Sequence, residues 1–132
     1  MKNLIAPLIF YFLLPTISCK NSPEVAENKN DLENTAWYGV ANIPTAENVT
    51  FKFTDNEFKV YVKDKVVEEM KYKVNNDSLI ITKIIGGSPC PVNSKGIYQY
   101  SIENQKLSLK FISEECDSRQ YNLNISNFVE VK

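Results

Sequence analysis

Residues 90–119 read CPVNSKGIYQYSIENQKLSLKFISEECDSR, two alternating runs between two cysteines. Apolar side chains recur at every second position in residues 98–102 and again in residues 107–111, a spacing typical of half-buried β-strands. The Asn104-Gln105 pair between the two runs predicts a turn. Each cysteine lies in an expected loop. We therefore predict a β-hairpin clamped by a Cys90–Cys116 disulfide, and two free buried thiols are the alternative.

The same period of two continues outward from this hairpin, and no stretch carries a helical stripe of apolar residues. Short strands joined mostly by tight turns favour an up-and-down barrel over a sandwich, which needs longer crossing connections. We predict an all-β fold for residues 35–132, a small eight-stranded up-and-down antiparallel barrel. The expected strands cover residues 34–41, 49–54, 58–63, 69–74, 78–85, 98–102, 107–111 and 120–125, with a short extra pairing in the tail at 128–131.

The N-terminus predicts secretion. Lys2 precedes an apolar run over residues 4–14, which is too short to cross a bilayer and is typical of a signal peptide ending at residue 18. Ser18 followed by Cys19 resembles the lipobox of bacterial lipoproteins, which implies a lipid on Cys19. An ordinary signal peptide with a free Cys19 is the alternative. We expect residues 19–34 to form a lipidated, flexible tether, and we expect anchoring in the bacterial cell envelope, facing the periplasm or the exterior.

Composition excludes several classes of function. The chain has 15 Lys and Arg against 16 Asp and Glu, with no basic block, so nucleic acid binding has no support. It has no histidine, which excludes a histidine-ligated metal site and a histidine general base. The carboxylates Glu114, Glu115 and Asp117 are expected in a solvated loop. No paired-carboxylate constellation can be built, so we expect that the protein is not an enzyme. We also expect a monomer that takes no metal and no cofactor.

The residues of inward parity carry a large aromatic volume, which predicts a mostly filled core with room for a small ligand near one mouth. Glu68 shares the inward parity, and burying an unpaired carboxylate is costly. It must therefore lie at a barrel mouth, pair with a cation or follow a β-bulge. The candidate ligand-facing residues are Phe51, Phe53, Phe58, Glu68, Tyr72, Tyr98, Tyr100 and Tyr121.

Trp37 lies in the sequence Leu32-Glu-Asn-Thr-Ala-Trp37, which resembles the first-strand signature of lipocalins and their calycin relatives, with Thr35 in place of the family's glycine. The resemblance covers roughly residues 32–131. It implies a lipocalin-like barrel in which Arg119, at the start of the last expected strand, packs across Trp37 and closes one end. A purely structural role for this pair is the favoured interpretation.

The resemblance also implies a function, the carriage of a small apolar or amphipathic molecule. A protein-binding module is the alternative, because several small bacterial lipoproteins with disulfide-pinned barrels inhibit host lysozymes by presenting a loop. Here the candidate is the long loop at residues 86–94. A carrier needs an open apolar mouth, whereas an inhibitor needs a rigid loop that protrudes.

Overall fold

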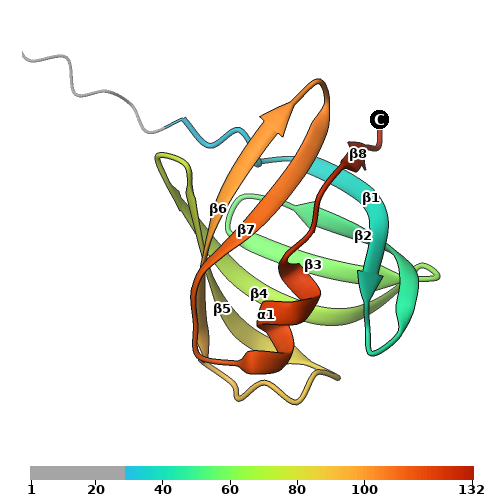
Figure 1. Ribbon diagram of the computed structural model, residues 1–132, viewed down its shortest axis with the longest axis vertical. Coiled ribbons are helices and arrows are strands. Elements are labelled where there is room, and N and C mark those ends of the chain that lie inside the picture. The colour runs from blue at the N-terminus through green and yellow to red at the C-terminus, as the bar shows by residue number, and fades with distance from the viewer. Residues whose placement is uncertain (1–28) are drawn as a thin grey trace, which may run out of the picture.

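The strands form one closed antiparallel barrel in the computed structural model, which describes residues 29–132 (Figure 1). Each strand pairs with its neighbours in sequence, and the last pairs with the first. This confirms the predicted all-β, up-and-down eight-stranded barrel. The strands are β1 (Thr35–Asn42), β2 (Ala46–Phe53), β3 (Glu57–Val62), β4 (Lys65–Asn75), β5 (Ser78–Gly86), β6 (Lys95–Glu103), β7 (Lys106–Glu114) and β8 (Phe128–Glu130).

Period-two alternation builds the core. In β2 and β3 the inward positions hold aromatic rings that contact one another: Phe53 stacks on Phe58 with centroids 4.4 Å apart, and Phe51 meets Phe58 edge-on at 5.1 Å. The turns use residues that tolerate a left-handed backbone, such as Asn76 (φ 55°) and Asn104 (φ 51°). Apolar burial on one face of each strand thus fixes both register and curvature.

The predicted strand at residues 120–125 is wrong. Residues Asp117–Leu123 form a short helix, α1, and the eighth strand is β8, in the tail. Alternating apolar residues at 121, 123 and 125 fit a strand, but the two buried residues of α1, Arg119 and Leu123, are one helical turn apart. Tyr121 therefore points to solvent, with 75% of its surface exposed, and is not a residue of the barrel interior.

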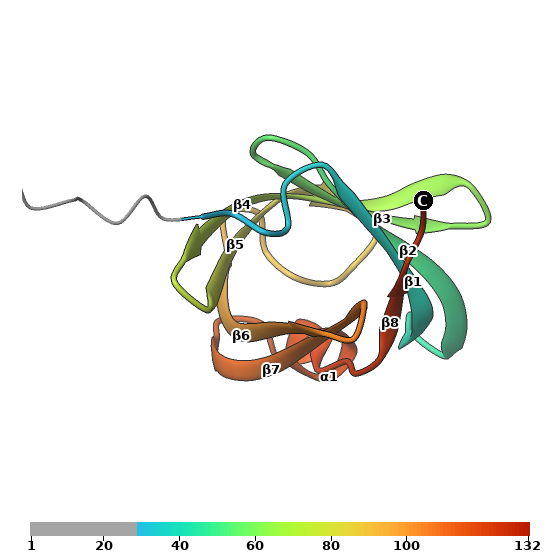
Figure 2. The same ribbon diagram turned by 90° about the horizontal axis from the view of Figure 1, so that it is seen from above.

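The short β8 leaves part of the barrel seam to α1. It pairs with β1 only at Trp37 and Tyr38, and with β7 only at Lys106 and Leu107. The helix α1 contacts both β7 and β1. Seen from above, α1 lies beside β7 on the same side of the barrel (Figure 2). Side chains of α1 thereby reach the barrel interior.

The two ends of the barrel are built differently. At one end, residues 30–34 pack against the core: Leu32 is fully buried, and Asn30 Nδ2 donates to Tyr72 Oη at 3.1 Å. Within the described residues, Asn30 and Leu32 of the segment predicted as a tether therefore pack against the barrel. The opposite end carries α1 and the loop at 86–94 (Figure 1). The predicted signal peptide and Cys19 lie outside the described residues.

Candidate functional site

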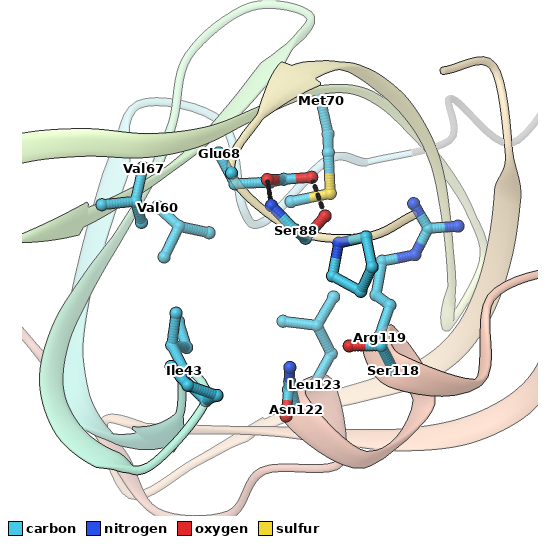
Figure 3. Close-up of a pocket in the computed structure, with 13 residues that line it drawn as sticks. Ile43, Val60, Val67, Glu68, Met70, Ser88, Ser118, Arg119, Asn122 and Leu123 are labelled. Atoms are coloured by element: carbon cyan, nitrogen blue, oxygen red, sulfur yellow. Dashed lines mark hydrogen bonds between the residues drawn. The ribbon is translucent and has the colours of Figure 1, made fainter. Parts of the chain in front are cut away.

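A cavity of about 420 Å³ lies at the barrel end that carries α1 and the 86–94 loop (Figure 3). Its walls come from the β1–β2 turn, β3, the start of β4, the loop and α1. Most of the lining is aliphatic. The lining residues are Ile43, Pro44, Val60, Val67, Glu68, Met70, Gly87, Ser88, Pro89, Ser118, Arg119, Asn122 and Leu123.

The 86–94 loop forms one wall of this cavity, because it is tied down at several points. The Gly87 amide donates to the Val67 carbonyl at 3.0 Å, and the Asn93 amide donates to the Lys83 carbonyl at 3.0 Å. Cys90 is bonded to Cys116, which confirms the predicted disulfide and joins the loop to the residue before α1. Gly86 has a φ of 154°, and a Cβ there would lie 2.0 Å from Glu68 Oε2. Only glycine allows this close approach of loop and carboxylate.

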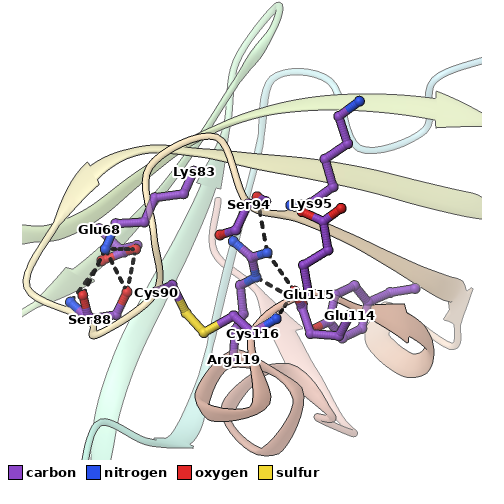
Figure 4. Close-up of polar contacts among 11 residues, drawn as sticks. Glu68, Lys83, Ser88, Cys90, Ser94, Lys95, Glu114, Glu115, Cys116 and Arg119 are labelled. Atoms are coloured by element: carbon purple, nitrogen blue, oxygen red, sulfur yellow. Dashed lines mark hydrogen bonds and ion pairs between the residues drawn. A yellow bond between two sulfur atoms is a disulfide. The ribbon is translucent and has the colours of Figure 1, made fainter.

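Glu68 pairs with a buried lysine from the neighbouring strand (Figure 4). Lys83 Nζ lies 3.2 Å from Glu68 Oε1, and the two side chains are 3% and 11% exposed. Ser88 completes the cluster: its hydroxyl and its amide donate to Glu68 at 2.7 and 3.2 Å, and its carbonyl accepts from Lys83 Nζ at 2.8 Å. The register also shifts between Val60 and Tyr61, opposite Glu68. Glu68 therefore meets all three expectations: it pairs with a cation, lies opposite a β-bulge and sits at one end of the barrel.

A second buried ion pair fixes α1 to the end of β7 (Figure 4). Arg119 donates to Glu114 through Nε at 2.8 Å and through Nη2 at 2.5 Å, and Nη2 also donates to the Ser94 carbonyl at 3.1 Å. The Glu114 side chain is fully buried, so the expectation of a solvated acidic loop is wrong for this residue. The bidentate pairing places Glu114 among donors that satisfy both of its oxygens.

Tyr98 extends this pair, donating from its hydroxyl to Glu114 Oε2 at 2.5 Å. Burial and the hydrogen bond to Glu114 raise the pKa of Tyr98 well above its ordinary value, because both oppose the phenolate. Burial lowers the pKa of Arg119, but the hydrogen bond and charge of Glu114 outweigh it, and the net shift is upward. Arg119 is thus held as a cation beside the cavity.

The implied packing of Arg119 across Trp37 has no counterpart among the ring contacts found in residues 29–132. The Trp37 indole instead donates to Thr35 Oγ1 at 2.8 Å. Arg119 belongs to α1 and takes its polar partners from Glu114 and Ser94.

Of the candidate ligand-facing residues, Glu68 lines the cavity. The buried aromatic candidates fill the core, and none of them lines the cavity: Phe51, Phe53, Phe58, Tyr72, Tyr98 and Tyr100. Four residues of the site were not among the candidates predicted from the sequence: Lys83 and the α1 residues Ser118, Asn122 and Leu123. Lys83 could have been found, since it shares the parity of Leu79 and Ile81.

Within residues 29–132, no group of three or more Cys, Asp or Glu side chains is arranged to hold a metal ion. The same part of the chain contains no helix long and apolar enough to cross a membrane. Comparisons with protein-family models, with curated proteins and with solved structures give no match.

Proposed function

We propose that the protein is a non-enzymatic lipoprotein of the bacterial cell envelope. It binds a small apolar or amphipathic molecule in the cavity at the barrel end that carries α1 and the 86–94 loop. The observation that carries this proposal is the cavity itself, about 420 Å³ with a mostly aliphatic lining. Ligand sites in proteins are typically apolar concavities of about 300–1,000 Å³ with a few placed polar groups. Glu68, Ser88, Ser118 and Asn122 are such groups here.

The position of the 86–94 loop favours a small ligand over a protein partner. Ser88 and Pro89 line the cavity, and Ser88 is hydrogen-bonded to Glu68 and Lys83. A loop that is bound inward in this way is a wall of a pocket and not a projection suited to enter another protein's cleft. Val92, 60% exposed, is the apolar side chain that the loop offers to a protein partner in the alternative proposal.

The segment that precedes the barrel would orient a lipid-anchored protein on the membrane. Leu32, close to the start of the described residues, is fully buried at the barrel end opposite the 86–94 loop. A lipid on Cys19 would hold this closed end toward the membrane. The cavity mouth would then face away from the bilayer, where a dissolved ligand can enter.

The proposal is tested with residues 20–132 produced without the lipid, using N-phenyl-1-naphthylamine, an uncharged fluorescent probe. Val67 lines the cavity, whereas the adjacent Val66 is 42% exposed. Val67→Phe should weaken probe binding at least tenfold by filling the cavity, and the matched control Val66→Phe should bind as the wild type does. Equal binding by both variants would place the probe elsewhere and contradict the proposal. Lysozyme inhibition that is lost in Val92→Asp would instead support the protein-binding alternative.

A further inference from the structure

The charges in the cavity wall are already compensated within the protein. Glu68 is paired with Lys83 and accepts two hydrogen bonds from Ser88. Arg119 is paired with Glu114 through two nitrogens. These two cations and two anions leave no net charge for a ligand to neutralise. A charged ligand would therefore lose its hydration without gaining a counter-ion, which is strongly unfavourable.

Three cavity-lining residues of α1 keep hydrogen-bonding groups without a partner among the described residues: Ser118, Asn122 and Arg119, whose Nη1 is buried. Ser118 and Asn122 are four residues apart, so they lie on the same face of the helix, and both line the cavity (Figure 3). Among residues 29–132 neither side chain has a hydrogen-bond partner, in contrast to Ser88. A serine hydroxyl and an asparagine amide can each both donate and accept. They are suited to a hydroxyl, carbonyl or ester group.

The opposite wall is apolar. Ile43, Val60 and Val67 lie across the cavity from Ser118 and Asn122 (Figure 3). The volume of about 420 Å³ lies near the lower end of the range of about 300–1,000 Å³ that is typical of small-molecule sites. The cavity thus has one wall with neutral polar groups and an aliphatic wall opposite to it.

The geometry points to an uncharged amphipathic small molecule, such as a medium-chain alcohol, ketone or ester, whose polar group binds Ser118 and Asn122. This inference rests on the proposed function and specifies its ligand class. The apolar part of the ligand contacts Val60, Val67 and Met70, and carboxylates and amines find no unpaired counter-ion, since Glu68 and Arg119 are already in ion pairs. Arg119 Nη1 adds a donor for an uncharged oxygen of the ligand. Ser118 and Asn122 set specificity, while the aliphatic wall supplies most of the affinity.

The test is an NMR titration of residues 20–132 with five ligands of similar size. These are 1-octanol, 2-octanone, octanoate, octylammonium and butylbenzene, which lacks a hydrogen-bonding group. The wild type should bind 1-octanol and 2-octanone at least tenfold more tightly than either ion. Equal or tighter binding of an ion would overturn the inference. If none of the five binds, the proposed function itself fails.

A double variant tests the role of α1. Ser118→Ala with Asn122→Leu should weaken 1-octanol binding at least fivefold and leave butylbenzene binding unchanged or tighter. The matched control is Ser113→Ala with Gln120→Leu, two polar residues outside the cavity lining, which should leave both affinities unchanged. An equal loss for 1-octanol and butylbenzene would assign Ser118 and Asn122 a packing role and overturn the inference.

Discussion

Breaking the Glu68–Lys83 pair should destabilise the protein far more than removing both charges together. The pair is almost fully buried, with side-chain exposures of 11% and 3%. In Lys83→Met the Glu68 carboxylate would keep only its two hydrogen bonds from Ser88. In Glu68→Leu the Lys83 ammonium would keep only the Ser88 carbonyl and hydroxyl. Each single variant therefore leaves one buried charge without its counter-ion.

The magnitudes follow from this partial satisfaction. Removing one member of a buried pair costs about 3–5 kcal/mol of unfolding free energy. We expect about 3–4 kcal/mol for each single variant, because the remaining charge keeps two hydrogen bonds to Ser88 in either case. The double variant leaves no buried charge and loses only the Ser88 hydrogen bonds, at about 2 kcal/mol. The double variant should therefore lose about 5 kcal/mol less unfolding free energy than the two single variants together, and this difference is the coupling between the two charges.

The assay is guanidinium unfolding followed by the fluorescence of Trp37, the single tryptophan, which is 1% exposed when folded. Lys59→Met is the matched control, because the Lys59–Glu57 pair is 30% and 50% exposed and should contribute at most about 1 kcal/mol. Additive single-variant losses in the double variant, or a loss below about 1 kcal/mol for Lys83→Met, would refute the reasoning.

Three further predictions concern the disulfide, the barrel seam and the buried tyrosine. Replacing Cys90 and Cys116 by serine opens a loop of 26 residues, which should lower unfolding free energy by about 3–4 kcal/mol and weaken ligand binding through the freed loop; unchanged stability in denaturant would contradict this. Gly39→Ala places a Cβ 2.3 Å from the Phe128 ring and should cost about 1–3 kcal/mol, whereas Gly87→Ala, whose nearest neighbour is 4.0 Å away, serves as a near-neutral control in the same unfolding assay. Because the folded-state pKa of Tyr98 is raised, its stabilising effect is complete below pH 10 and is lost as pH rises further, so wild type should lose stability above pH 10 more steeply than Tyr98→Phe. Parallel alkaline titrations of the two proteins would contradict that assignment.

Much of the barrel follows from the sequence because period-two alternation is a local property. Phe51 and Phe53 alternate with charged and polar neighbours, and only the inward face of a curved sheet accommodates them. The disulfide was also predictable, since it joins two loop cysteines across one hairpin. The special setting of Glu68 could also be predicted, because a carboxylate that points inward is costly to bury without a partner.

The segment after Cys116 could not be assigned in the same way. Leu123 is buried in α1, but the same residue alternates with polar neighbours as it would in a strand. The choice depends on Arg119, which reaches Glu114 from the helix and leaves Tyr121 exposed. That pairing is a tertiary contact, and it outweighs local pattern over seven residues.

The cavity was predictable only as a location. An excess of aromatic residues indicates a filled core with space at a mouth, and the structure has this arrangement. The residues that line the space come from a turn, a loop and α1, whose relative positions depend on the two buried ion pairs. The burial of Leu32 could not be predicted either, because a single apolar residue in a polar segment shows no periodicity.

The most direct test of the account is a crystal structure of residues 20–132 grown with 1-octanol. The account predicts the hydroxyl within hydrogen-bond distance of Ser118 or Asn122, with the alkyl chain against Val60 and Val67. Bound 1-octanol on the outer face of the barrel, or a cavity closed by movement of α1 with no ligand inside, would contradict it.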